Sequence, residues 1–451
     1  MEFNPLPIII AAVGSYFLIK LRFFFILHPV VAVSRGLRAI KDKRARRSFS
    51  LALAGTLGVG NVFGVALGVL IGGAGSLFWL FVSMIFAMVI KYAEVVITAD
   101  NLYHDRDTHG GIYYVIRASF LRGAGALSYI YSASIFGLSL FMGAALQSDA
   151  VVESALAITD VPRIPIGIFV LLITLVAIIG GTRKIEKITS IIIPITTIVY
   201  IFITLSVVIS HIDGLNRVLS LILESAFCPK SAVGGTVGFL TLAPIREGFA
   251  RGLLSNEAGA GTSSVAHARS GVLSPSSAGL LGVFEVWFDT GLICMLTGLS
   301  ILLAVPDISI FESGMQLVSY SVGSLFGTVG KVAVTLCVFA FAYATVICWY
   351  YYGSEACGFL FGKRKRAAFL PLFLTFVFVG CFADTMILVS VTDALMLIST
   401  VITLLVLIKN SDRIRYLSEI GGVICSDRIR VKRLRAKSIK GNGFSTGERR
   451  R

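Results

Sequence analysis

The sequence Gly55-Thr56-Leu57-Gly58-Val59-Gly60-Asn61 lies inside an apolar run from about Leu51 to Ile71. Three glycines and two polar side chains within these seven residues make a poor helix centre, because each glycine costs about 1 kcal/mol relative to alanine. In hydrocarbon, a loosened backbone also exposes polar groups that lipid cannot satisfy. Such a segment is tolerated where it is buried in protein or lines a wet cavity. The stretch therefore predicts a discontinuous membrane helix of the kind that forms transporter binding sites.

The composition of the whole chain supports a membrane location. Of 451 residues, 56% are apolar and only 14% are charged. Successive apolar runs have the length of about 20 residues that a helix needs to cross a hydrocarbon layer. Because the runs are continuous rather than alternating, they exclude an outer-membrane barrel. The predicted fold class is an all-α polytopic membrane protein.

The placement of the net charge of +15 indicates membrane topology. Basic residues cluster at 35–47, at 363–366 and through the tail from 409 to 451. Short basic loops beside apolar spans follow the positive-inside rule, and basic segments contact anionic lipid. The charge therefore predicts contact with the lipid bilayer and no binding of nucleic acid.

The apolar runs predict about eleven transmembrane helices in a plasma (inner) membrane, with the N-terminus outside and the C-terminus cytoplasmic. In this orientation, only Arg163, Arg217 and Lys230 of the 40 basic residues fall in outer loops. Residues 211–230 are expected to form an outer loop, and residues 307–330 an outer segment. The expected spans are 5–20, 49–70, 76–98, 124–151, 166–179, 185–210, 231–268, 278–305, 331–352, 367–382 and 386–408.

The spans also suggest an internal repeat. Without the first helix, ten spans remain and divide five and five. The first span of each half, 51–71 and 231–268, is interrupted by glycine, and the two start from opposite sides of the membrane. Matching interruptions predict a 5+5 inverted repeat around a midplane site. The expected parts are a peripheral N-terminal helix with a basic cytoplasmic linker (1–47), a first repeat (48–211), a second repeat (212–408) and a basic cytoplasmic tail (409–451).

The interrupted stretch can supply ligands for a cation and for an amino acid. If the helix unwinds, freed carbonyl groups and the side-chain oxygens of Thr56 and Asn61 can coordinate a small hard cation. Free N–H groups at the start of the outer half-helix can hold a carboxylate. The alternative is close helix packing, because glycine recurs at every fourth position from Gly60 to Gly68. We assign binding to residues 55–61 and packing to the later glycines.

A second polar cluster lies within residues 244–268. Ionisable residues in a membrane span are costly and by default indicate a functional site. A direct role in substrate or ion binding is expected for Gly248 and Gly252, and ordinary gate or loop ion pairs are the alternative. The expected gating or structural residues are Arg251, Asn256 and Glu257.

Isolated polar residues in other spans are further candidates. Gln147 can hydrogen-bond a bound amino acid, with an interhelical bond as the alternative. Thr345 and Trp349 lie on one helix face, where a hydroxyl ligand for an ion and an aromatic pocket wall would suit them.

The charged pairs within spans have simpler interpretations. Lys91 and Glu94 are expected to form an i,i+3 pair near the membrane interface. Glu285 and Asp289 lie on the same side of a helix, and both a helix-capping role and a place on the ion path remain open for them.

Catalytic motifs are absent from the sequence. The five histidines are scattered and the seven cysteines lack metal-binding spacing. There is no HExxH, Walker A or nucleophile-elbow motif. The sequence therefore predicts no enzyme and no cofactor, and uphill transport would have to be driven by an ion gradient.

Together these residues resemble the alanine/glycine:cation symporter family, also called sodium:alanine symporters. The resemblance covers nearly the whole chain up to Gly362 and leaves out the basic tail. The matching motifs are GTLGVGN (55–61), KYAE (91–94), GGIYY (110–114), ARGLLSNEAG (250–259), FEVWFDT (284–290) and WYYYG (349–353).

The resemblance implies a leucine-transporter-like fold of the amino acid–polyamine–cation superfamily, with one extra N-terminal helix. It implies Na⁺-coupled symport of small neutral amino acids, alanine or glycine, by alternating access. An H⁺-coupled or exchanging transporter of the same fold, and a non-transporting sensor or channel, are the alternatives. The implied ligands are Gly55, Thr56 and Gly60 for the substrate, the Leu57 carbonyl and Thr345 for Na⁺, and Asn61 for either.

Overall fold

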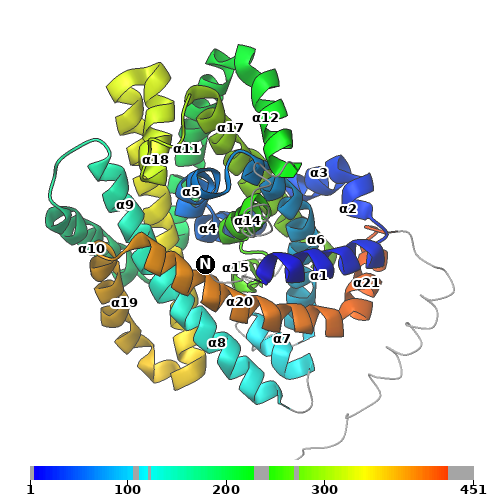
Figure 1. Cartoon of the computed structure of the whole chain (residues 1–451). Coiled ribbons are helices and arrows are strands. Elements are labelled where there is room, and N and C mark those ends of the chain that lie inside the picture. Colours follow the sequence, from blue (N-terminus) through cyan, green and yellow to red (C-terminus); the bar gives the residue numbers. More distant parts are fainter. Residues whose placement is uncertain (1–4, 105–110, 120–122, 228–242, 269–273, 425–451) are drawn as a thin grey trace, which may run out of the picture.

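The computed structural model describes residues 5–104, 111–119, 123–227, 243–268 and 274–424, and every regular element in these ranges is a helix. This confirms the all-α fold class. In the same ranges, six helices are long and apolar enough to cross a membrane, and a seventh span results if one bent pair is counted together. The chain is a multi-pass membrane protein (Figure 1).

The helices follow one another through the whole described chain. In order they are α1 (Leu6–Lys20), α2 (Phe24–Leu27), α3 (Pro29–Ala39), α4 (Lys43–Thr56), η1 (Val59–Asn61), α5 (Phe63–Gly72), α6 (Gly75–His104), α7 (Ile112–Ser119), α8 (Ala124–Leu140), η2 (Phe141–Leu146), α9 (Gln147–Leu156), α10 (Arg163–Ile179), α11 (Gly181–Ser210), η3 (Ile212–Gly214), α12 (Leu215–Phe227), α14 (Ala243–Asn256), α15 (Thr262–Ala268), α16 (Pro275–Val286), η4 (Trp287–Cys294), α17 (Met295–Ala304), α18 (Gly314–Phe361), η5 (Lys363–Lys365), α19 (Arg366–Gly380), α20 (Thr385–Lys409) and α21 (Ser411–Ile420).

The predicted count of about eleven spans stays a prediction. Three further apolar helices, α1, α10 and α19, are shorter than the full spans. The span predicted at 231–268 begins outside the described residues.

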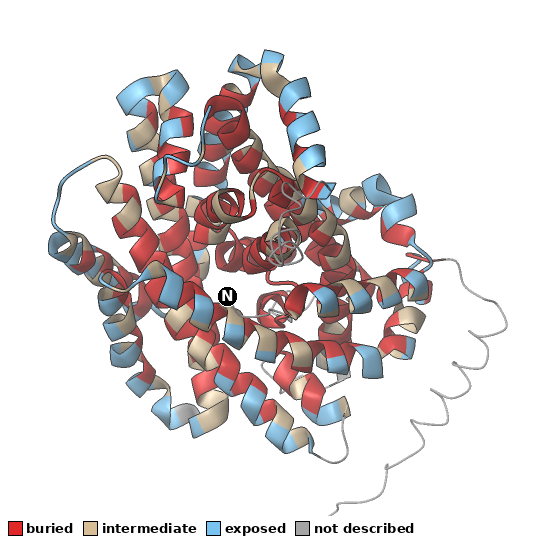
Figure 2. Ribbon diagram, in the orientation of Figure 1, coloured by how far each residue is buried: buried red, intermediate tan, exposed pale blue. Residues whose placement is uncertain are grey.

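The short helices α4, α5, α14 and α15 lie in the middle of the molecule, with longer helices around them (Figure 1). Their residues are mostly buried, whereas the outer faces of the surrounding helices are exposed (Figure 2). Many of those exposed side chains are large and apolar, such as Ile198 and Phe202 of α11. Such faces suit contact with lipid rather than water.

The predicted interruption at residues 55–61 is confirmed. Helix α4 ends at Thr56, and Gly58 takes up an extended conformation with φ −117° and ψ −153°. The single 3₁₀ turn η1 follows, and α5 then continues at 63° to the direction of α4. The glycine-rich sequence permits this break because it adds little helix propensity to oppose it.

The first span of the predicted second repeat is also interrupted. Helix α14 ends at Asn256, and α15 begins at Thr262. Between them Glu257, Gly259 and Gly261 have positive φ values of 52°, 83° and 83°. Gly259 and Gly261 therefore occupy turn positions whose positive φ values are unfavourable for most other residues.

Two segments contain more helix than expected from the sequence. The predicted outer loop at 211–230 contains helix α12, which buries Val218 and Ile222. With 13 residues this helix is shorter than the length of about 20 residues that a membrane span needs. Helix α4 begins at Lys43, so the boundary expected between residues 47 and 48 falls inside this helix.

The first part of the expected basic tail is ordered as α21. Its Arg413 guanidinium donates two hydrogen bonds of 2.8 Å to the Asp100 carboxylate of α6. The rest of that tail, from residue 425, lies outside the described residues.

Candidate functional site

The predicted residues of α18 meet the carbonyl groups at the end of α4. Trp349 Nε1 donates to the Gly55 carbonyl at 3.4 Å, and Thr345 Oγ1 donates to the Leu57 carbonyl at 3.4 Å. Thr345 and Trp349 are one helical turn apart, so both point to the same side of α18. The structure thus brings together four residues that the sequence assigned to substrate and ion.

Gln147, the first residue of α9, also contacts the interruption. Its Oε1 atom accepts a hydrogen bond from the Val59 amide at 3.1 Å. Gly58 lies between Gln147 and Thr345, and a Cβ atom there would be 2.9 Å from Gln147 Oε1 and 2.7 Å from Thr345 Oγ1. Only glycine lets these two polar groups approach the unwound backbone so closely.

Asn61 lies in a buried polar cluster. Its Nδ2 atom donates to Asp289 Oδ1 at 2.5 Å and to Ser255 Oγ at 3.0 Å. Ser255 Oγ in turn donates to Asp289 Oδ2 at 2.5 Å. Within the described residues, Asn61 Oδ1 has no hydrogen-bond partner although it is buried. An unpaired buried acceptor is unfavourable, and this oxygen is available to a cation or an ammonium group.

Asp289 and Ser255 are absent from the set of site residues predicted from the sequence. For Asp289, the sequence left open a capping role and a place on the ion path. The structure puts its carboxylate against Asn61, although 228 positions separate the two residues. A signal was available: Asp289 is an acid in an apolar span, where ionisable groups are rarely placed without a function.

Two π-helical turns adjoin these polar groups. One is η2, which immediately precedes Gln147, and the other is η4, which contains Asp289. A π turn inserts one extra residue into a helix and is frequent at functional sites. The residue patterns of these helices show no such insertion, so the sequence did not reveal it.

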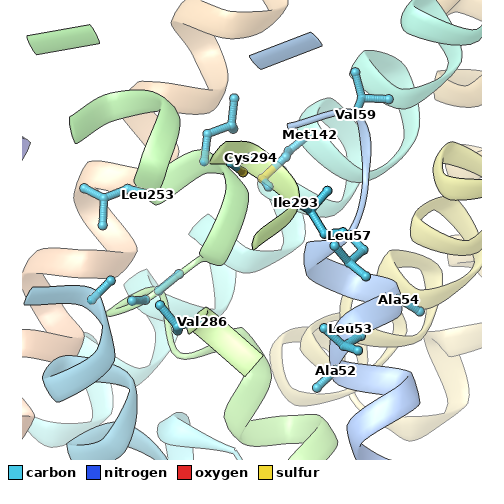
Figure 3. Close-up of a cluster of buried hydrophobic side chains, with 14 of the residues drawn as sticks. Ala52, Leu53, Ala54, Leu57, Val59, Met142, Leu253, Val286, Ile293 and Cys294 are labelled. Atoms are coloured by element: carbon cyan, nitrogen blue, oxygen red, sulfur yellow. The ribbon is translucent and has the colours of Figure 1, made fainter. Parts of the chain in front are cut away.

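Apolar side chains enclose the interruption. Leu57, Val59, Leu253 of α14 and Ile293 of η4 belong to the cluster of buried apolar side chains around it (Figure 3). All four are buried, with at most 1% of the residue exposed. Their packing keeps bulk water from the polar cluster, so electrostatic interactions there are stronger than at a surface.

Thr56 and Gly60, the other predicted substrate ligands at the break, make local contacts. Thr56 is buried, and its hydroxyl donates to the Ala52 carbonyl of its own helix at 3.4 Å. A Cβ atom at Gly60 would lie 3.3 Å from the Leu254 carbonyl oxygen and 3.3 Å from Ser255 Cα. The small residue lets α14 pack directly against η1.

Gly248 and Gly252 are not brought to the first interruption. Both lie inside continuous helix α14 and face α6. A Cβ atom at Gly248 would be 2.5 Å from the Ser76 carbonyl oxygen, and one at Gly252 would collide with Ser83 Oγ. These contacts account for the two glycines as helix-packing positions.

The expected gating or structural residues make intramolecular contacts around α14. Arg251 forms an i,i+4 ion pair with Glu247 at 3.0 Å. Asn256 Oδ1 accepts from the Ala258 amide at 3.0 Å, and the Glu257 carboxylate accepts from Thr262 Oγ1 at 2.5 Å. The Asn256 bond lies at the end of α14, and the Glu257 bond spans the second interruption to the start of α15.

Lys91 forms a different ion pair from the one expected. Its side chain is fully buried and lies 3.5 Å from Glu285 and 2.5 Å from Ser263 Oγ. The second Glu285 oxygen is 2.7 Å from His267 Nε2. The expected pair of Lys91 with Glu94 is therefore corrected, because helix packing brings Glu285 to the lysine.

Glu94 instead supports the second interruption. Its carboxylate accepts a hydrogen bond from the Gly259 amide at 3.1 Å. Tyr131 of α8 donates to the neighbouring Ala260 carbonyl at 2.9 Å. Side chains of α6 and α8 therefore satisfy backbone groups that the break in the helix leaves without partners.

This architecture defines a class of protein. Two interrupted helical segments lie in the middle of the helix bundle, and Asn61 beside the first break meets Ser255 near the end of α14 in a buried polar cluster. That arrangement is characteristic of secondary transporters. The chain belongs to the sodium:alanine symporter family, whose family model matches residues 2–415.

Several curated relatives are similar over most of their length. The sodium/alanine symporter AgcS of Methanococcus maripaludis is 29% identical, with 76% of each chain covered. The sodium/proton-dependent alanine carrier protein of Bacillus sp. (strain PS3) is 28% identical over 73% of this chain and 76% of that one. The probable sodium/glutamine symporter GlnT of Bacillus subtilis is 28% identical over 89% of this chain and 84% of its own.

Among solved structures, a manganese transporter of Eremococcus coleocola shares the fold. The TM-score is 0.50 at 15% sequence identity, and the match covers 80% of this chain and 76% of that one. The family and these relatives are transporters, which confirms the prediction that the chain is not an enzyme.

Proposed function

We propose that the protein is a Na⁺-coupled symporter of small neutral amino acids, alanine or glycine, that works by alternating access. The observation that carries the proposal is the interruption at Leu57–Val62, with carbonyl and side-chain oxygens gathered around it. Two relatives, a sodium/alanine symporter and a sodium/proton-dependent alanine carrier, support the same substrate and ions.

The ion would bind among neutral oxygen atoms. The Leu57 carbonyl and the Thr345 hydroxyl, 3.4 Å apart, with the unpartnered Asn61 Oδ1, offer the oxygen ligands that hard cations prefer. The neighbouring Asp289 carboxylate adds a negative charge that favours a cation in this region.

The amino acid would bind on the other groups of the interruption. N–H groups at the start of the outer half-helix favour its carboxylate, and Trp349 provides an apolar wall. Gly248 and Gly252, which were also predicted to bind substrate, are assigned here to the packing of α14 against α6. The proposed substrate ligands are Gly55, Thr56, Gly60, Asn61, Gln147 and Trp349.

We also propose the finer architecture that transport by this mechanism requires. It comprises about eleven spans, a 5+5 inverted repeat at 48–211 and 212–408, and an N-terminus outside with a cytoplasmic C-terminus. The two interrupted helices, one at the start of each proposed repeat, support the inversion. No cofactor takes part apart from the coupling ion.

The proposal is tested by uptake of labelled alanine into proteoliposomes. An inward Na⁺ gradient should drive accumulation, and an ionophore that dissipates the gradient should abolish it. Unlabelled glycine should compete with alanine. Stronger competition by glutamine would move the substrate towards that of the B. subtilis relative.

The same assay separates the alternatives. Equal uptake driven by a pH gradient without Na⁺ would replace sodium coupling with proton coupling. Uptake that needs internal amino acid and no ion gradient would indicate an exchanger. Unitary ion currents in a planar bilayer, without accumulation of alanine, would indicate a channel.

A further inference from the structure

Two adjoining cavities lie beside the N-terminal half of the interrupted span, where α4 faces α11. One has a volume of about 670 Å³ and the other about 420 Å³. Arg47 and Ser190 line both cavities, so the two form one continuous groove. Volumes of this size suit a small organic ligand.

The larger cavity is mainly apolar. Phe49 and Leu53 of α4 line one side, and Ile193, Ile198 and Ile201 of α11 line the other. Ile198 is 69% exposed, so the groove opens to the outside of the helix bundle. In a membrane, this opening faces acyl chains.

The end shared with the smaller cavity is strongly basic. Five cationic side chains line the groove, and Glu186 is the one acidic residue among those that line it. The cations come from the first two turns of both α4 and α11, so the positive charge is gathered at one end of the groove. They are Lys43, Arg46, Arg47, Arg183 and Lys187.

We propose that this groove binds an anionic phospholipid, with its phosphate among the basic side chains and one acyl chain along the apolar wall. A soluble anion would not use the apolar wall, and a neutral lipid would not use the excess of cations. Basic pockets between membrane helices recognise lipid headgroups in this way. The inference does not depend on the transported solute or the coupling ion.

The position of the groove gives the lipid a structural effect. One wall is α4, the half-helix that ends at the interruption, and the other is α11. A lipid that contacts both walls links α4 to the bundle beside its hinge. We therefore expect the anionic lipid to raise the melting temperature of the protein as well as to bind it.

A cavity on the other side of α11 provides an internal comparison. It has a volume of about 380 Å³ and is lined by Phe169, Ile195, Phe339 and other residues, none of them charged. Acyl chains can enter it, but nothing in its lining selects a headgroup. Preference for anionic lipid should therefore reside in the groove between α4 and α11.

The experiment is native mass spectrometry of the full chain in detergent with added dioleoyl phosphatidylglycerol or dioleoyl phosphatidylcholine. The wild type should retain phosphatidylglycerol preferentially. The triple variant R47Q/R183Q/K187Q should weaken that retention by about fivefold for each charge removed. The control variant R364Q/K365Q removes two exposed cations outside the groove and should behave as wild type.

A second pair of variants adds bulk to α11 without changing its charge. Ser190→Trp places a bulky ring where the two cavities join and should abolish the lipid preference. Ser206→Trp, further along the same helix, should leave it intact. Melting temperatures without added lipid establish that each variant is folded, and only folded variants are compared.

Three results would overturn the proposal. They are equal retention of the two lipids by the wild type, undiminished preference in folded triple and Ser190→Trp variants, and equally tight binding of glycerol phosphate. The last result would assign the basic residues to a soluble anion, because glycerol phosphate has the headgroup charge without acyl chains.

Discussion

At the scale of single residues, Gly58 has the least space for a side chain among the three glycines of residues 55–61. A methyl group there would come within 2.7 Å of Thr345 Oγ1 and 2.9 Å of Gln147 Oε1. Because both contacts are polar groups of the proposed site, any relaxation must move them. A substitution at Gly58 should therefore reduce transport more strongly than it reduces the stability of the fold.

We expect Gly58→Ala to reduce Na⁺-driven alanine uptake by at least about tenfold, since small misplacements of binding groups can cost that much or more. Gly64→Ala is the matched control, because its added Cβ would meet only Leu254 Cδ2, at 3.7 Å. Uptake per inserted protein is the measurement. Similar losses in both variants would contradict a specific role for Gly58.

Asn61 gives the second prediction at this scale. Asn61→Ala removes the Oδ1 ligand and the hydrogen bond to the Asp289 carboxylate. Because a bond to a charged group contributes about 1.5–3 kcal/mol, we expect coupled uptake to be lost while membrane insertion is retained. Asn410→Ala, on the last turn before α21, is a control that should transport normally. Normal uptake by Asn61→Ala would count against a site at the interruption.

At the scale of elements, the two interrupted spans are held in different ways. The backbone at η1 is contacted by Gln147 and Thr345, which belong to the proposed binding site. The turn between α14 and α15 is contacted by Glu94, with the buried Lys91–Glu285 pair beside it. The second break therefore depends on charged groups in the protein interior, where an unpaired charge is costly.

Lys91→Met should lower the free energy of unfolding by about 3–5 kcal/mol, because it leaves the Glu285 carboxylate without its lysine partner. Adding Glu285→Gln should restore part of the loss. Lys20→Met breaks the exposed pair with Asp412 and should cost no more than about 1 kcal/mol. Unfolding in detergent micelles measures all three. Equal effects of the two lysine substitutions would contradict a stabilising role for the buried pair.

At the scale of the whole molecule, the distribution of charge predicts the orientation in the membrane. The basic clusters at 35–47 and 363–366 must lie on the same side if an even number of spans separates them. The positive-inside rule predicts that this side is the cytoplasm. The groove between α4 and α11 would then face the cytoplasmic leaflet, where a basic pocket meets anionic lipid.

We expect a fluorescent protein fused after residue 451 to fold and fluoresce in the cytoplasm, and alkaline phosphatase fused at the same point to be inactive. An N-terminal epitope should be accessible to antibody on spheroplasts. Active phosphatase at the C-terminus would reverse the orientation, and with it the leaflet that supplies the lipid.

The sequence by itself determined the features that depend on neighbouring residues. The density of apolar residues predicted an all-α membrane protein, and the glycines at 55–61 predicted the break that separates α4 from α5. Both are local, because helix propensity and membrane partition are set by residues adjacent in the chain. Gln147, Thr345 and Trp349 could also be proposed, since each is a polar or aromatic group within an apolar run.

Only the tertiary structure decided which side chains face one another. It paired Lys91 with Glu285 instead of Glu94, and it brought Asp289 to Asn61. It also turned Gly248 and Gly252 towards α6. These outcomes depend on how each helix is rotated and how closely its neighbours pack. Residue spacing along one helix carries no information about the rotation of another, so the contacts arise only when the bundle is assembled.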